Sequence, residues 1–197
     1  LDMLRVYSSQ NTRKDMEDGN KVLLPPRILE TIMHMGDLPH PMIFSMSCLR
    51  NQKTIYVGVL EFIADDDKII VPKWLFNELH FKEGEMIRLG LVDYLPKATF
   101  VQICPHKTEF IDLPDPRSIL EIHLRNFVCL TKGETITIHF LNKAYQIDIL
   151  NIKPENQYNA AILIDTDVNL EFAAPLDYVE PVKKEVVDKN KAIRLNN

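Results

Sequence analysis

The chain has 197 residues, a formal net charge of −5 at pH 7, and 46% hydrophobic and 26% charged residues. This composition is typical of a globular protein with one or two domains, since a chain of this length buries roughly 70% of its unfolded surface. The acidic balance argues against nucleic acid as a partner, because phosphates require a basic face. No apolar run approaches the roughly 20 residues that a membrane-spanning helix needs, so we expect no membrane insertion.

Two stretches near the start of the chain share one pattern. In Val22–Ile32 and in Ile69–Leu79, a short aliphatic run meets a proline, and apolar residues then follow at the spacing of one helix face. Proline suits a strand-to-helix junction, because it cannot donate to a sheet but is preset for the first helical turn. The second copy continues into a glycine turn and an alternating strand at Phe81–Leu89, and Leu130–Ile138 repeats that turn. We therefore predict a closed barrel over about residues 4–106, with two equivalent units.

The remaining elements of the first part follow from β-branched runs and turn signals. The expected elements in chain order are an edge strand at Leu4–Ser8, a loop at Gln10–Lys21, a helix that ends near Met35–Gly36, and strands at Met42–Met46, Thr54–Ile63, Gly90–Val92 and Ala98–Ile103.

A proline-rich stretch at Cys104–Pro116 predicts a boundary between two subdomains. Beyond it we expect a helix at Ile119–Phe127, a hairpin of Thr135–Phe140 and Lys143–Asn151, and a buried strand at Ala160–Ile164. The predicted division is 1–108 for the barrel, 109–180 for a mixed α/β subdomain, and 181–197 for a mobile linker or tail.

The candidates for chemistry are weak. Cys48, Cys104 and Cys129 are odd in number and widely spaced, which favours buried, reduced thiols. His34, His40, His106, His123 and His139 show no CxxC or HxxxH spacing, so we expect no metal and no cofactor. Ala161–Asp167 resembles the Asp-Thr-Gly run of aspartic proteases, but Asp167 stands where those enzymes need glycine. No enzymatic activity is predicted.

Several longer stretches resemble the ubiquitin fusion degradation protein 1 family. They are IIVPKWLFNEL (69–79), LRNFVCLTKG (124–133), DVNLEFAAPLDY (167–178) and GVLEF (58–62). The resemblance implies an α+β, mostly β fold, in which a double-psi β-barrel is followed by a smaller mixed α/β subdomain. It also implies a non-enzymatic adaptor of the cytoplasm and nucleus, with recruitment to the ER surface, that binds ubiquitin and polyubiquitin chains. The family works with a heterodimeric adaptor partner and a hexameric AAA unfoldase, the valosin-containing protein, through motifs in a later flexible tail.

Two acidic turns are candidate ubiquitin contacts, because ubiquitin offers an apolar patch ringed by basic groups. The first candidate surface comprises Asp165, Asp167, Val168 and Leu170, where acidic and aliphatic residues alternate. The second comprises Asp65, Asp66 and Asp67. Either turn could instead be simply solvated. Two other functions stay open, a structural subunit-pairing module without ubiquitin binding and an enzyme built on a double-psi barrel.

Overall fold

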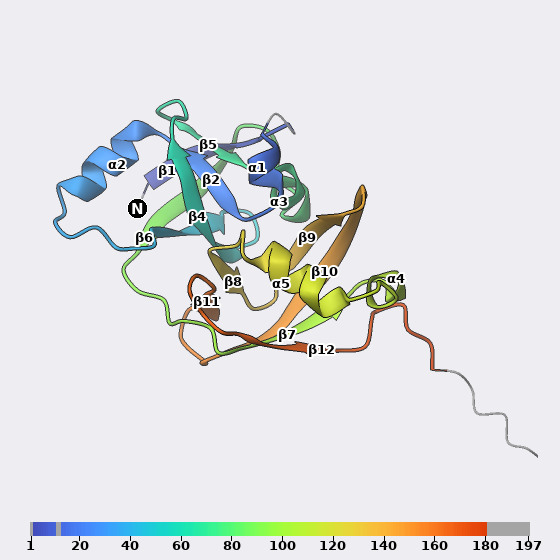
Figure 1. Ribbon diagram of the computed structural model, residues 1–197. Helices are drawn as coiled ribbons and strands as arrows, with labels where there is room; N and C mark the ends of the chain where they lie inside the picture. Colours follow the sequence, from blue (N-terminus) through green and yellow to red (C-terminus); the bar gives the residue numbers. More distant parts are fainter. Residues whose placement is uncertain (1, 11–12, 181–197) are drawn as a thin grey trace, which may run out of the picture.

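A computed structural model describes residues 2–10 and 13–180 (Figure 1). The predicted tail at 181–197 lies outside the described residues. The secondary structure alternates short helices with strands. In chain order the elements are β1 (Asp2–Ser8), α1 (Lys14–Glu17), β2 (Lys21–Leu24), α2 (Pro26–Met33), β3 (Ile43–Cys48), β4 (Thr54–Phe62), β5 (Lys68–Val71), α3 (Lys73–Glu78), β6 (Glu85–Val92), β7 (Phe100–Pro105), α4 (Thr108–Ile111), α5 (Pro116–Leu124), β8 (Cys129–Thr131), β9 (Thr135–Phe140), β10 (Lys143–Lys153), β11 (Ala160–Ile162) and β12 (Asn169–Phe172).

The first six strands form a closed barrel in the order β1-β5-β2-β4-β3-β6. β1 runs parallel to β5 and antiparallel to β6, while β4 runs parallel to β2 and antiparallel to β3. Exchanging β1 with β4, β2 with β5 and β3 with β6 therefore reproduces the pairing pattern, and the two central strands meet at Leu23 and Ile70. This is the predicted double-psi β-barrel with two equivalent units. β1 is not the predicted edge strand, because a closed barrel has no edge.

Both predicted strand–proline–helix junctions are confirmed. Pro25 caps α2 and Pro72 caps α3 at the point where the preceding barrel strand ends. α2 buries Ile28 and Ile32, and α3 buries Trp74 and its neighbour in the chain. The apolar residues of each helix therefore lie on one face, and that face packs against the barrel.

The rest of the chain forms the second subdomain, drawn below the barrel in Figure 1. It has a four-stranded sheet in the order β12-β7-β10-β9 and a two-stranded sheet of β8 and β11. α5 begins at Pro116. The Asp115 side chain caps this helix by accepting a hydrogen bond from the Ser118 N–H at 3.1 Å. The predicted hairpin is confirmed, with Leu141 and Asn142 in the left-handed turn conformation between β9 and β10.

The predicted boundary at residue 108 needs a correction. β7 belongs to the second subdomain, since it pairs with β10 and β12, and the barrel sheet ends at Val92. Ile103 lies opposite Ile149 on one side and Phe172 on the other. The prolines after Cys104 mark the end of a strand and not a change of subdomain.

A buried joint connects the barrel to the second subdomain. The Asn20 side chain donates to the Cys129 carbonyl at 2.7 Å and accepts from the Val128 N–H at 3.0 Å. Gly58 in β4 lies so close to Val128 that a Cβ atom there would sit 2.3 Å from a Val128 methyl carbon. The joint therefore depends on the side-chain amide of Asn20, which pairs with two backbone groups, and on the absence of a side chain at Gly58.

Candidate functional site

The segment between β11 and β12, residues 163–168, is the centre of the candidate site. We call it the 163–168 loop. The Thr166 hydroxyl donates to the Leu163 carbonyl at 2.9 Å, and the Lys97 ammonium donates to the Asp165 carbonyl at 3.2 Å. Asp165 has a φ of 50°, a left-handed conformation that aspartate tolerates better than most residues. Local hydrogen bonds thus fix the loop and leave the carboxylates of Asp165 and Asp167 exposed.

One side of the loop borders a cavity of about 430 Å³ at the junction with the barrel, which we call the proline groove. Its apolar lining includes Pro39, Pro41, Val92, Tyr94, Ile162 and Ile164. Asp93 and Asp165 lie in the same lining and are exposed. The proline groove thus combines an apolar floor with two carboxylates and with Lys97, which lies in the same lining.

The other side of the loop borders a cavity of about 290 Å³ beside α5, which we call the α5 groove. Asp167 and Val168 line it together with Glu121, Leu124 and Arg125. The loop therefore presents one aspartate to each groove.

The structure brings all four predicted contact residues to this site. Asp165 lines the proline groove, and Asp167 and Val168 line the α5 groove. The fourth, Leu170, also lines the α5 groove, but it pairs with Val101 in the sheet and is only 3% exposed, so most of its side chain belongs to the core. An alternating pattern does not say which strand face is buried.

The second predicted turn lies elsewhere, on the barrel, and two of its three carboxylates are in ion pairs. Asp65 contacts Lys68 at 2.6 Å, and Asp67 contacts Arg5 at 3.7 Å. The Arg27 guanidinium donates to the Asp66 carbonyl at 2.7 Å. Three basic side chains therefore offset the negative charge of this turn.

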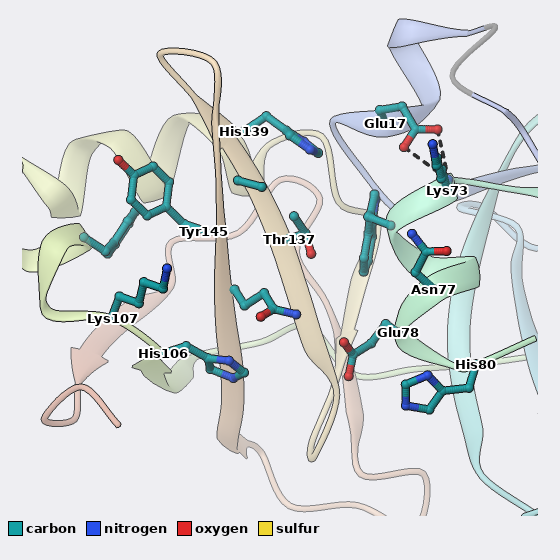
Figure 2. A pocket seen from close by; sticks show the side chains of 14 residues that line it. Glu17, Lys73, Asn77, Glu78, His80, His106, Lys107, Thr137, His139 and Tyr145 are labelled. Carbon is teal, nitrogen blue, oxygen red and sulfur yellow. Dashed lines mark hydrogen bonds between the residues drawn. The ribbon is translucent and has the colours of Figure 1, made fainter. Parts of the chain in front are cut away.

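Sequence reasoning did not find a further cavity, a cleft of about 520 Å³ between α3 and the β9–β10 hairpin (Figure 2). We call it the α3 cleft. Its lining includes His80, His106 and His139, which come from three separate stretches of the chain. No group of three or more histidine, cysteine or acidic side chains within residues 2–10 and 13–180 is placed to hold a metal ion. No spacing in the sequence could have revealed this cleft.

The three cysteines are buried and free, as predicted. Burial raises the pKa of the Cys104 thiol, and it raises the pKa of the Cys129 thiol well above its usual range. Thiolate formation, which nucleophilic chemistry requires, is therefore disfavoured at both positions.

Comparison with known proteins gives the family. Residues 2–95 match the family described as "Ubiquitin fusion degradation protein UFD1, N-terminal subdomain 1", and residues 97–175 match the description "N-terminal subdomain 2" of the same protein. The chain belongs to the ubiquitin fusion degradation protein 1 family. The two matched segments meet between β6 and β7, where the chain changes sheets.

Three relatives of this family illustrate the similarity. The Homo sapiens protein "Ubiquitin recognition factor in ER-associated degradation protein 1" is 34% identical over 91% of this chain and 57% of its own length. "Ubiquitin fusion degradation protein 1" of Saccharomyces cerevisiae is 34% identical over 86% of this chain and 46% of its own length. The homolog from Dictyostelium discoideum is 38% identical over 85% of this chain and 49% of its own length. The chain thus spans about half the length of the curated relatives it matches.

Among the helices of the described residues, none has the length and apolar character needed to cross a bilayer.

Proposed function

We propose that this chain recognises ubiquitin and polyubiquitin chains as part of an adaptor. The adaptor would deliver ubiquitinated proteins to a hexameric AAA unfoldase, the valosin-containing protein, for proteasomal or ER-associated degradation. Family membership and the printed name of the human relative support the ubiquitin-binding role. Docking of the unfoldase and of a heterodimeric adaptor partner is expected to use segments outside these 197 residues. We place the protein in the cytoplasm and nucleus, with recruitment to the ER surface.

The observation that carries the proposal is the 163–168 loop with a groove on each side. Ubiquitin presents an apolar patch with a basic rim, so its reader needs an apolar recess beside carboxylates. The proline groove offers that recess with Asp93 and Asp165, and the α5 groove offers Val168 with Asp167. Asp65, Asp66 and Asp67 are the weaker candidate, because the basic side chains of the barrel face them.

Two grooves beside one loop favour chains over single ubiquitin units. A contact of this size contributes on the order of −5 kcal/mol, which corresponds to binding between millimolar and micromolar. When two units are linked, the second contact is intramolecular, with an effective concentration of about millimolar. Chain binding would then be much tighter than binding of one unit.

The proposal includes no catalytic role. Its support is chemical: raised pKa values disfavour thiolate formation at Cys104 and Cys129, and the name of the human relative describes recognition. A phosphate-cradling glycine loop is also missing from the sequence, which contains only six glycines.

The decisive experiment is a titration of fluorescently labelled chain with tetraubiquitin and with monoubiquitin, at low and moderate salt. We expect tetraubiquitin to bind more tightly, and the double variant Asp165→Lys with Asp167→Lys to bind it about tenfold more weakly, mostly at low salt. The matched control is Asp66→Lys on the barrel.

Unchanged affinity in the double variant, with the fold intact, would reject the 163–168 loop as the contact. A wild-type chain that binds no tetraubiquitin at millimolar concentration, and that self-associates, would instead favour the subunit-pairing alternative.

A further inference from the structure

The α5 groove and the proline groove lie on opposite sides of the 163–168 loop. Asp165 lines one groove and Asp167 lines the other, so the Cα atoms at the two rims are at most about 7 Å apart. A folded domain of about 100 residues has a radius of gyration of about 13 Å. A folded unit seated in the proline groove therefore covers the loop as well, and only a narrow segment that continues from this unit can enter the α5 groove beside it.

The α5 groove has the size of a binding site for a short chain segment. Its volume of about 290 Å³ is close to the lower limit of ligand sites, roughly 300 Å³. Leu124, Leu163 and Val168 give it apolar walls, and Leu163 and Val168 are half-buried. Aliphatic side chains of an extended segment gain free energy by burial against such walls.

The charged side chains of the α5 groove favour a basic segment. Its lining contains the carboxylates of Glu121 and Asp167 and the guanidinium of Arg125. All three groups are exposed, and none of them forms an ion pair within residues 2–10 and 13–180. The lining therefore carries a formal charge of −1. Because exposed charges are screened by water and salt, this preference amounts to a factor of a few in affinity.

Backbone groups beside the α5 groove are already paired at two positions. The Leu170 carbonyl accepts from the Arg117 guanidinium at 2.9 Å, and the Leu163 N–H donates to the Val128 carbonyl at 2.9 Å. An occupant of the groove is therefore held through its side chains and not as an added strand. Such an occupant needs aliphatic side chains for the walls and basic side chains for the two carboxylates, in an extended chain.

The connection between two ubiquitin units has this chemistry. Chains form when the carboxyl-terminal tail of one unit is joined to a lysine of the next, and this extended tail reads Leu-Arg-Leu-Arg-Gly-Gly. We propose that the α5 groove binds the carboxyl-terminal tail of a ubiquitin unit whose folded body occupies the proline groove. The leucines contact Leu163 and Val168, and the arginines face Glu121 and Asp167. This role of the groove rests on the proposed function, and in a chain the next unit follows at the end of the bound tail.

The first test uses the 197-residue chain labelled with ¹⁵N and three capped peptides. They are acetyl-Leu-Arg-Leu-Arg-Gly-Gly-amide, the same peptide with Glu in place of Arg, and the same peptide with Ser in place of Leu. We expect the Leu-Arg peptide to shift the amide signals of Glu121 and Val168 and to bind about threefold more tightly than the Glu peptide. The Ser peptide should bind about tenfold more weakly, because it lacks the two aliphatic side chains.

Three results of this titration would overturn the tail site. Equal binding of the Arg and Glu peptides would contradict selection by the carboxylates of the groove. Shifts confined to Asp93 and Tyr94 in the proline groove, or no shift at millimolar peptide, would show that the tail does not enter the α5 groove. Signals of the α5 groove that move with protein concentration alone would assign the groove to a second copy of this chain.

Two variants with opposite expected effects test the charges of the groove. Glu121→Gln removes one of the two carboxylates and should weaken binding of the Leu-Arg peptide about twofold. Arg125→Gln removes the guanidinium and should strengthen it by about the same factor. Glu155→Gln, in an exposed loop that does not line the α5 groove, is the matched control and should leave binding unchanged. Changes in the same direction for the first two variants would contradict selection by charge.

A second test separates the tail site from the ubiquitin contact as a whole. Monoubiquitin that lacks its last six residues should bind the wild-type chain about threefold more weakly than intact monoubiquitin, and Glu121→Gln should reduce this difference. Equal affinities of the two forms for the wild-type chain would overturn the tail site and leave the proposed function in place. If neither intact monoubiquitin nor tetraubiquitin bound at millimolar concentration, the proposed function would fail together with the tail site.

Discussion

The barrel and the second subdomain differ in whether their sheets have edge strands with unpaired backbone groups. Every strand of the barrel has a neighbour on both sides, whereas the second sheet leaves β9 and β12 with one neighbour each. The proline groove, the α5 groove and the α3 cleft all include residues of the second subdomain. A closed sheet offers no backbone to a partner, so the barrel serves as a scaffold and the open region carries the contacts. Four changes would test this division.

The largest effect is expected at the joint, where the open region depends on the barrel. Asn20→Ala leaves the Cys129 carbonyl and the Val128 N–H buried without partners. We expect the free energy of unfolding in urea to fall by about 2–6 kcal/mol, because each unsatisfied group costs about 1–3 kcal/mol.

The control for Asn20→Ala is Asn51→Ala, which removes an exposed hydrogen bond to the Lys53 N–H. Its loss should stay below about 1 kcal/mol. Equal losses in the two variants would mean that the joint contributes little to stability.

We expect the free energy of unfolding to depend on pH through the second subdomain. That region contains Glu134, the only buried carboxylate among the described residues. Burial raises the pKa of Glu134 to about 8, so the folded state holds a proton that the unfolded chain releases near pH 4.5. Stability is therefore highest below the unfolded pKa and falls as pH rises toward 8.

The measurement is the free energy of unfolding in urea at pH 5 and at pH 8. We expect wild type to lose about 2–4 kcal/mol over this interval relative to Glu134→Gln. Asp15, Glu109, Asp115 and Asp177 have lowered pKa values, so their contribution is lost only as pH falls further and does not overlap with this window. A parallel pH dependence in both proteins would show that Glu134 is ionised in the folded state.

The proposed ubiquitin contact allows a matched apolar comparison between the regions. Ile164→Ser in the proline groove should weaken tetraubiquitin binding about tenfold, the cost of one lost apolar side chain. Ile63→Ser, at an exposed barrel position, should leave binding unchanged. If both substitutions weakened binding equally, the barrel would share the contact.

The smallest effect is expected for Asp66→Lys in the acidic turn of the barrel. Arg5 and Lys68 already neutralise the neighbouring aspartates, so one further positive charge changes the local field little. Tetraubiquitin affinity, measured by the same titration, should change by less than about twofold. A loss comparable to that of Ile164→Ser would identify the barrel turn as a second contact.

The sequence predicts those parts of the fold that depend on neighbouring residues. The prolines at 25 and 72 end strands and begin helices, and the Leu141–Asn142 turn closes its hairpin, because each of these rules acts over a few residues. The sequence predicts β7 as part of the barrel, which is wrong, because its partners, β10 and β12, lie more than thirty residues later in the chain. Pairing over such distances leaves no local signal.

The candidate site was predictable to a similar degree. The acidic residues of the 163–168 loop stand out in the sequence, but the burial of Leu170 depends on Val101, a residue far away in the chain. The α3 cleft combines residues from positions 17 to 146, and only the folded chain brings them together.

Trp74 gives the protein an internal optical reporter. It is the only tryptophan in the sequence, and its indole N–H donates to the Gly19 carbonyl at 3.1 Å, with its ring 5.9 Å from that of Phe127 across the joint. The same residue lines the α3 cleft. Unlabelled protein should therefore emit blue-shifted fluorescence while the joint is closed and shift toward red when it opens. One side chain thus reports whether the barrel and the second subdomain remain packed against each other.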